Sequence, residues 1–368
     1  MRFVSPILKH AIYPSLASAG YFRGTSRRGL AVITYHGVLP PHYKPIDPGF
    51  DGSLITAEEF RRQLRLLKAS HEIISPEDML SWCRNERALP DRAALLTCDD
   101  GLLNNLTEML PILQDEGLRC LFFVTGASAG EERTMLWHEE LLLLFLRARS
   151  GSFRICRDGF EIGGVLAGNK QRRVLWWNCV KRLSQIDAEN RKSFLHAVHE
   201  HFGLESTLEF YLASYPETQR HFCLMTRSEL QQLVAAGMTI GAHTLSHPVL
   251  SQMSPELAWS EIVQGRARLE AAIGKPIWAF AYPFGDAGSV SPRVTAMAKQ
   301  SGFDSAFINI GGGLGTELLL HAIPRVHVNA GMALSEFEAH VSGFYETLQR
   351  RVRRSPQTGV PGLEAVST

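Results

Sequence analysis

The sequence alternates short apolar runs with amphipathic stretches, and this alternation constrains the fold more than any other feature of the chain. Apolar runs of strand length lie at 31–36, 93–98 and 120–126, and stretches with helical periodicity separate them. The same rhythm returns at Thr226 and continues to a last helical stretch near 334–350. Repeated βα units build a parallel sheet covered by helices, so we predict an α/β fold.

Residues 127–225 interrupt this rhythm. The run FRICRDGFEI alternates with period 2 about an Asp-Gly turn and predicts a hairpin, and the stretches around it are rich in Leu and Trp with helical spacing. We interpret the segment as a mainly helical insertion or cap. Trp137, Trp176 and Trp177 have the chemistry to stack on sugar rings, but core packing is the favoured interpretation in leucine-rich helices.

The two ends of the chain differ in character. Residues 1–29 hold no apolar run long enough for a signal core or a membrane span. Their apolar residues, followed by arginines, suit a short amphipathic helix on an inner membrane surface, while a helix packed on the domain is the favoured alternative. Residues 351–368 mix basic residues with Gly, Pro and Ser and are predicted to be disordered.

Charge and cysteine content restrict the partners and the compartment. Lys plus Arg numbers 38 and Asp plus Glu 37, so no overall field attracts nucleic acid, and any partner must be recognised locally. The six cysteines show no CxxC spacing and most lie in apolar runs, which favours reduced thiols and a cytoplasmic location. The oligomeric state is not predicted by the sequence.

Polar residues follow several of the predicted strands. Asp99 and Asp100 end one strand, and His243 with His247 ends another. The carboxyl ends of parallel strands meet at one edge of the sheet, where functional side chains collect. Two imidazoles and one carboxylate can hold a catalytic cation such as zinc with a position left open. Either motif alone is common by chance, and it is their joint placement at strand ends that predicts a metal site.

These motifs resemble those of the polysaccharide deacetylase family, also called the NodB-homology or carbohydrate esterase 4 group. TCDDG (97–101) looks like its first motif, HTLSH (243–247) its second and FAYPFG (280–285) its third. The resemblance covers about residues 30–126 and 226–330. It implies a distorted (β/α)7 barrel, for which we assign 30–126 and 226–350, and a divalent metal cofactor, with zinc preferred.

The resemblance also implies roles for individual residues. Asp99 would be the general base, and Asp100, His243 and His247 would be the metal ligands. The chain departs from the family pattern at Ala281, where an arginine is usual, and at Phe284, where a tyrosine is usual.

The third motif supplies further candidates. The backbone N–H of Phe284 could still stabilise an oxyanion, since that role needs no particular side chain. Tyr282 and Pro283 are candidate substrate contacts, and His36, which ends the first strand, is expected at the same mouth.

The run IPRVHVN suggests how the missing arginine is replaced. Strand alternation puts Arg325, His327 and Asn329 on one face, so Arg325 is predicted to be the charge partner of Asp99. His327 is the candidate general acid, with a structural histidine in the barrel wall as an equal alternative. His321, at the opposite end of the strand, is the weaker candidate.

The combined prediction is a hydrolase that removes the N-acetyl group from an acetylated amino sugar in a polysaccharide or its precursor, as in exopolysaccharide biosynthesis. Two alternatives stay open. One is a deformylase or deacetylase of a lipid-linked sugar, which would use the same residues with a different pocket. The other is a non-catalytic saccharide-binding barrel, against which the intact base beside the ligand set argues.

Overall fold

The computed structural model describes residues 6–22, 29–47, 51–204, 218–310 and 319–348, and within them nine strands pair in parallel in one sheet. The apolar runs of the sequence form its strands, and most of their residues are buried. The strands are β1 (Gly29–Tyr35), β2 (Glu72–Ile73), β3 (Arg92–Cys98), β4 (Leu121–Val124), β7 (Thr239–Ala242), β8 (Ala279–Ala281), β9 (Ser305–Ile308), β10 (Ile323–Pro324) and β11 (Val326–His327).

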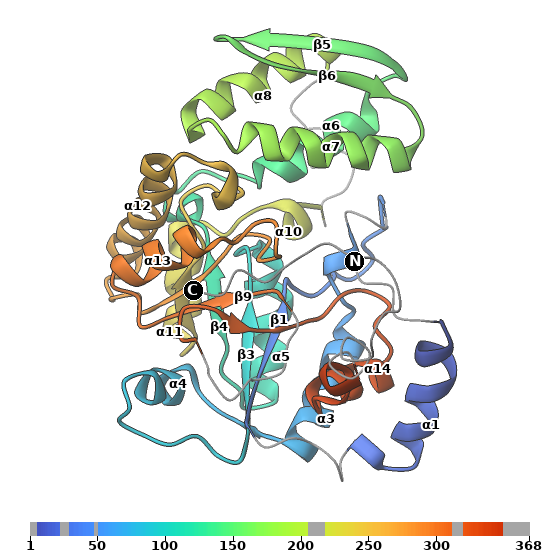
Figure 1. The fold of residues 1–368 in the computed structure, drawn as a ribbon, viewed down its shortest axis with the longest axis vertical. Helices are drawn as coiled ribbons and strands as arrows, with labels where there is room; N and C mark the ends of the chain where they lie inside the picture. Colours follow the sequence, from blue (N-terminus) through green and yellow to red (C-terminus); the bar gives the residue numbers. More distant parts are fainter. Residues whose placement is uncertain (1–5, 23–28, 48–50, 205–217, 311–318, 349–368) are drawn as a thin grey trace, which may run out of the picture.

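One short segment closes the sheet into a barrel. The order is β10-β9-β8-β7-β4-β3-β1-β11, with β2 beside β3. β10 pairs with β9 and β11 pairs with β1, yet only Arg325 separates β10 from β11 in the chain. Residues 323–327 therefore join both ends of the sheet and occupy one of the seven strand positions of the barrel (Figure 1). The predicted (β/α)7 barrel is confirmed.

Helices connect these strands and follow the sequence signals. The capping boxes at Thr56 and Thr226 are present, with the Glu59 and Glu229 carboxylates accepting from the N-cap backbone N–H groups. The helix predicted near 334–350 is interrupted, because α14 ends at Val341, Gly343 takes a positive φ of 74°, and residues 344–348 are helical again. The helices are α3 (Ala57–Ser70), α4 (Pro76–Cys83), α5 (Leu110–Asp115), α11 (Arg227–Ala235), α12 (Pro255–Ile273), α13 (Pro292–Gln300) and α14 (Leu334–Val341).

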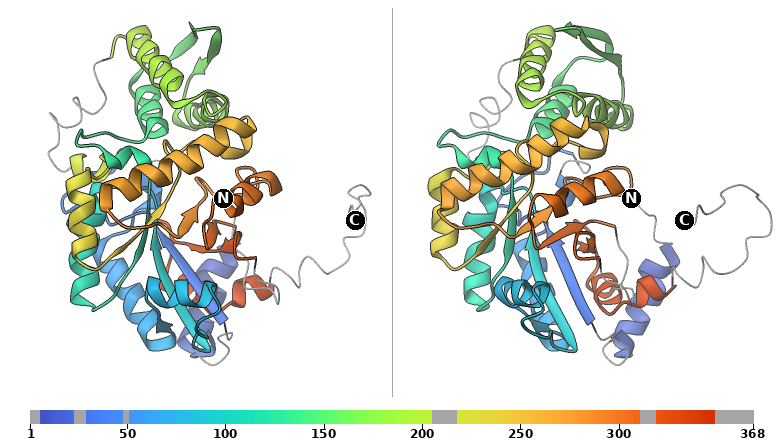
Figure 2. Two further views of the ribbon diagram at one scale, coloured as in Figure 1. Left: turned by 90° about the vertical axis from the view of Figure 1, so that its left-hand side faces the viewer. Right: turned by 60° about the vertical axis from the view of Figure 1, so that its left-hand side comes forward.

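Residues 137–202 form a second group of elements at one end of the barrel (Figures 1 and 2). The hairpin has the turn that the sequence predicts, with positive φ at both Asp158 and Gly159. Its elements share a hydrophobic cluster that is distinct from the barrel core. They are α6 (Trp137–Arg147), β5 (Gly151–Arg157), β6 (Phe160–Leu166), α7 (Asn169–Leu183) and α8 (Ala188–Phe202). We refer to these elements as the insertion.

The N-terminal segment packs on the barrel. Helix α1 (Tyr13–Ser18) lies against α14, and Tyr13 is fully buried in a cluster with Phe22 and Phe344. Of the helices in the described ranges, none is both long enough and apolar enough to cross a membrane. Residues 351–368, predicted to be disordered, lie outside the described residues.

Helix α12 approaches the loop after β7 closely, because Gly265 has no side chain. A Cβ atom placed on Gly265 would lie 2.6 Å from the backbone nitrogen of Leu245, a distance that real Cβ atoms do not adopt. Gly265 is buried inside the helix, where glycine is otherwise the weaker choice. Glycine lowers the helix propensity at this position, but it allows the helix to pack closely against the loop that carries His243 and His247.

This contact predicts an inverted effect of alanine. Gly265→Ala would stabilise an isolated helix by about 1 kcal/mol, but the clash with the loop backbone is rigid and should lower the free energy of unfolding by about 1–3 kcal/mol. Urea unfolding followed by circular dichroism measures the difference. Gln264→Ala, on the exposed side of the same helix, should change it by less than about 0.5 kcal/mol. A Gly265→Ala protein more stable than the parent would contradict the packing.

Candidate active site

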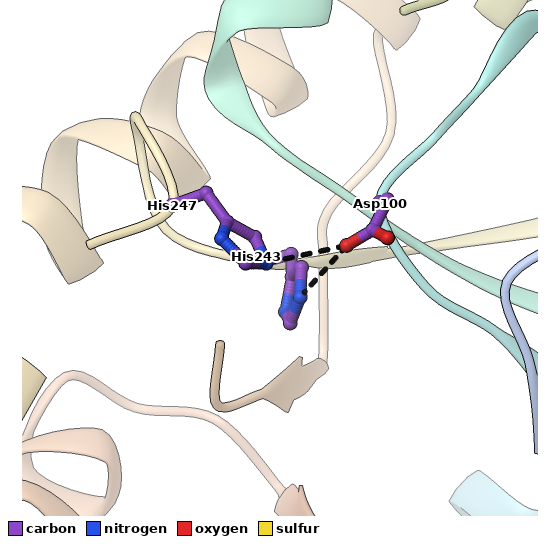
Figure 3. Close-up of side chains that lie close together, drawn as sticks. All are labelled: Asp100, His243 and His247. Carbon is purple, nitrogen blue, oxygen red and sulfur yellow. Dashed lines mark ion pairs between the residues drawn. The ribbon is translucent and has the colours of Figure 1, made fainter. Parts of the chain in front are cut away.

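The carboxyl ends of the barrel strands bring the predicted residues together. Asp99 and Asp100 follow β3, and His243 and His247 follow β7. Their side chains converge, as Figure 3 shows for Asp100 and the two histidines. Asp100 Oδ1 lies 3.5 Å from Nε2 of His243 and 3.2 Å from Nε2 of His247. All three side chains are buried.

These distances suit a divalent cation. Ligand atoms about 2.0–2.1 Å from a tetrahedral ion lie roughly 3.3 Å from one another, which matches the two separations. His243 Nδ1 donates to the Ala281 carbonyl oxygen at 2.7 Å, so its Nε2 is the free, metal-facing nitrogen. Burial lowers the pKa of His247 and favours the neutral imidazole that a metal requires. The residues present therefore fit the metal that their types suggest.

Asp100 is held as a carboxylate by the same pair. Burial would raise its pKa, but hydrogen bonding with His243 and His247 outweighs burial and holds the pKa well below its usual range. The site thus presents an anionic oxygen and two imidazole nitrogens to one point.

The loop that carries the histidines is strained and clamped from two sides. Thr244 and His247 both take positive φ values, 65° and 61°. On the barrel side, the Glu261 carboxylate of α12 accepts from the Ser246 N–H at 2.8 Å and from the Ser246 hydroxyl. On the insertion side, the buried Arg191 guanidinium donates to Ser246 Oγ at 2.8 Å.

A second insertion residue holds the same loop. The Trp137 indole N–H donates to the carbonyl oxygen of His247 at 3.2 Å, and the Arg191 guanidinium lies 4.7 Å from the centre of the Trp137 ring. The insertion therefore takes part in positioning the loop that carries His243 and His247. Trp137 packs in the core, in line with the favoured interpretation of the sequence.

Asp99, the predicted base, is paired with Arg325. The guanidinium donates to both carboxylate oxygens, at 2.7 and 2.6 Å, and both residues are about 1% exposed. Burial would raise the pKa of Asp99, but the charge and hydrogen bonds of Arg325, together with the nearby His243 and His36, outweigh burial and lower the pKa. The geometry thus supplies the partner that Ala281 cannot, from the segment that closes the barrel.

His327 follows Arg325 by two residues and contacts His36, with the two ring centres 4.9 Å apart. Burial, followed by the nearby His36, lowers the pKa of His327 to about 3. Its imidazole is therefore neutral at pH 7. His321 lies ahead of β10, at the opposite end of that strand, and its Nε2 donates to the Phe303 carbonyl oxygen.

Residues of the third motif lie in two places, with Phe284 at the site and Tyr282 in the core. Phe284 has a positive φ of 61° inside a tight turn, in which the Gly285 N–H donates to the Pro283 carbonyl oxygen. Its ring lies 4.8 Å from that of His247. Tyr282 is fully buried, and its hydroxyl donates to the His321 carbonyl oxygen, because strand alternation turns its side chain away from the mouth. The structure does not bring Tyr282 or Pro283 into the pocket wall.

A pocket of about 160 Å³ lies over Asp99, Asp100 and the histidine pair, and His36 and Phe284 line it. The insertion also lines the pocket with His138, Glu139 and Leu142, which the sequence reasoning did not assign. Trp176, for which core packing was the favoured interpretation, lines the pocket as well. The polar residues His138 and Glu139 at the start of an apolar helix could have indicated a functional role. Helical periodicity, however, does not show which strand ends a helix covers.

The Asp99–Arg325 pair predicts a large stability effect. Arg325→Met should lower the free energy of unfolding by about 3–5 kcal/mol, because a buried carboxylate loses its partner. The double variant Asp99→Asn with Arg325→Met should recover part of that loss. Denaturant unfolding of the three variants measures these differences.

The chain offers a matched surface control. Arg84 also donates two hydrogen bonds to one carboxylate, that of Asp304, but its side chain is 49% exposed. Arg84→Met should therefore lower the free energy of unfolding far less than Arg325→Met does. Equal losses for Arg84→Met and Arg325→Met would contradict a special role of burial at Asp99.

Comparison with known proteins agrees with this geometry. A family model described as polysaccharide deacetylase matches residues 197–306, which include HTLSH and the YPFG turn. The putative polysaccharide deacetylase YxkH of Bacillus subtilis (strain 168) is 20% identical over 146 residues, which are 40% of this chain and 50% of that protein. The chain thus spans about half the length of this curated relative.

Two solved structures share the fold. The Streptococcus pyogenes deacetylase PplD, in complex with acetate, superposes with a TM-score of 0.51 at 14% identity, covering 85% of this chain and 97% of that one. IcaB from Ammonifex degensii superposes with a TM-score of 0.50 at 17% identity, covering 86% and 98%. At these identities the likeness concerns the barrel.

Proposed function

We propose that this chain, which resembles polysaccharide deacetylases in its matched segment and in its fold, hydrolyses the N-acetyl group of an acetylated amino sugar, in a polysaccharide or its precursor, and releases acetate. The observation that carries this proposal is the pairing of two carboxylates with separate tasks. Asp100 faces His243 and His247, while Asp99 is held by Arg325 beside them. A protein that only binds saccharide has no use for an ionised base next to a metal site.

The metal of this proposal is zinc, held by Asp100, His243 and His247. When bound, such an ion polarises the amide carbonyl and lowers the pKa of water toward neutrality. The protein contributes a buried loop that keeps the ligand atoms in place before the ion binds.

Asp99 accepts a proton from the attacking water in this scheme. The Arg325 pair keeps the Asp99 carboxylate ionised and fixes its orientation, which general base catalysis requires. In this scheme the backbone N–H of Phe284, which lies in a tight turn beside the pocket, would donate to the developing oxyanion. His327 is neutral at pH 7, so in this scheme it would deliver to the departing amine the proton that Asp99 has taken from the water.

We also propose a cytoplasmic location with contact between the N-terminal segment and the inner membrane surface. All six cysteines are free thiols and five are buried, as expected for a reducing compartment. The N-terminal segment buries Tyr13 but leaves Ile7 68% and Tyr21 43% exposed. These two side chains have the apolar character that an interfacial contact needs.

The base can be tested by one substitution. Asp99→Asn should lower acetate release from N-acetylhexosamine oligomers by at least about 100-fold, while the protein keeps its metal, as measured by mass spectrometry of the eluted ion. Asp115→Asn is the matched control, since its carboxylate is 61% exposed on α5 and pairs with Arg61. Full activity of Asp99→Asn would refute the assigned base.

Metal dependence is tested by chelation. Dialysis against a chelator should abolish acetate release and lower the melting temperature, because an ion that binds only the folded state stabilises it, and added zinc should restore both. His247→Ala should already melt at the lower temperature and respond to neither treatment. Activity that survives complete metal removal would end the proposal.

A further inference from the structure

Buried polar atoms without hydrogen-bond partners gather around the pocket. Among the described residues, five of its lining residues carry such an atom: His36 Nδ1, His138 Nδ1, Glu139 Oε2, His247 Nδ1 and Asn309 Oδ1. An unpaired buried polar atom is costly, and native proteins keep few of them. Their concentration at one pocket indicates that a bound molecule completes their hydrogen bonds.

Glu139 stands apart from the others. It lies in the first turn of α6, so it comes from the insertion, and the proposed chemistry uses no group on that side. Its neighbour Glu140 hydrogen-bonds through its carboxylate to His199 at 2.7 Å, whereas Oε2 of Glu139 has no partner within the described ranges. Two adjacent glutamates of one helix thus have different surroundings, one tied within the insertion and one at the pocket.

An aromatic residue of the insertion lines the same pocket as Glu139. It is Trp176 of α7, and its indole N–H donates to the His138 carbonyl oxygen at 2.6 Å. This bond fixes the ring with its polar atom already satisfied, so what it offers the pocket is an apolar face. Asn309, after β9 in the barrel, also lines the pocket with an unpartnered acceptor oxygen.

We infer that Glu139 is a substrate-binding residue that selects the sugar, accepting hydrogen bonds from ring hydroxyl groups while an apolar face of the sugar rests on Trp176. This inference rests on the proposed function, since it names what the insertion adds to the deacetylase site. A sugar ring has the required chemistry: hydroxyl donors at its edge and C–H groups on its faces. The pocket volume of about 160 Å³ suits roughly one such ring.

The electrostatics of Glu139 agree with a binding role. Burial, followed by the charges of Asp100 and Asp51, raises its pKa well above the usual range. A carboxyl group kept in such surroundings reduces the stability of the empty protein. Residues placed at the expense of stability are typical of binding sites.

The test compares Glu139→Ala with Glu140→Ala in the zinc-loaded, full-length protein. With the N-acetylglucosamine tetramer as the probe, Glu139→Ala should raise KM by roughly 10-fold, the loss expected for one or two hydrogen bonds to an uncharged carboxyl group, with a smaller change in kcat. Glu140→Ala should leave KM within about twofold of the parent. Glu139→Gln, which retains one acceptor oxygen, should recover part of the loss.

Two further readouts separate binding from structure. Glu139→Ala should melt at the same temperature as the parent or higher, because it removes an unpaired buried group, and its zinc affinity should be unchanged. A merely structural glutamate would lower the melting temperature instead. Unchanged KM, or a KM that rises only together with a fall in melting temperature, would overturn the inference.

Calorimetry distinguishes this inference from the proposed function. Tetramer binding is measured in the Asp99→Asn background, where the sugar is not consumed. If the parent releases acetate, and Asp99→Asn binds the tetramer with the same affinity whether or not it also carries Glu139→Ala, the proposed function stands and the inference is overturned. Binding that weakens with Glu139→Ala, in a protein whose parent releases no acetate, would support the inference and refute the function. No binding by the parent would overturn the inference as well.

Discussion

The structure depends on one short segment, residues 323–327, which pairs with both ends of the sheet. Ile323 and Pro324 pair with β9, while Val326 and His327 pair with β1. Among the described strands these two pairings close the barrel, and the residue between them is Arg325. Closure therefore carries a buried positive charge to the carboxylate of Asp99, and the ion pair joins the closing segment to the first motif. A buried carboxylate is tolerated at Asp99 because the same segment that completes the sheet also neutralises it.

The barrel strands and the residues at their carboxyl ends were predictable from the sequence, because buried strands have a simple and regular residue pattern. Burial on both faces gives near-continuous apolar runs, and polar residues directly after such runs mark the mouth of the barrel. Alternation was enough to predict that Arg325 replaces the arginine missing at Ala281. The same alternation argues against Tyr282 as a substrate contact, because its side chain points into the core, where its hydroxyl meets the His321 carbonyl group.

Other features depend on contacts that no local pattern contains. Periodicity indicates that α6 is amphipathic, but not that its first turn reaches the metal-binding loop, so His138 and Glu139 went unassigned. The N-terminal helix has an apolar side, and only the tertiary packing of Tyr13 against Phe344 shows what covers it. Assignment of His327 as the acid relied on strand register alone, whereas its pKa of about 3 depends first on its burial and then on the neighbouring His36.

The hydrogen bonds from Arg191 to Ser246 and from Trp137 to His247 have a consequence for the geometry of the site. An insertion that swung away from the barrel would break both bonds, and the loop that carries His243 and His247 would then depend on Glu261 of α12. The position of the insertion and the geometry of the two imidazoles are therefore coupled, so a shift of α6 or α8 is transmitted to His243 and His247.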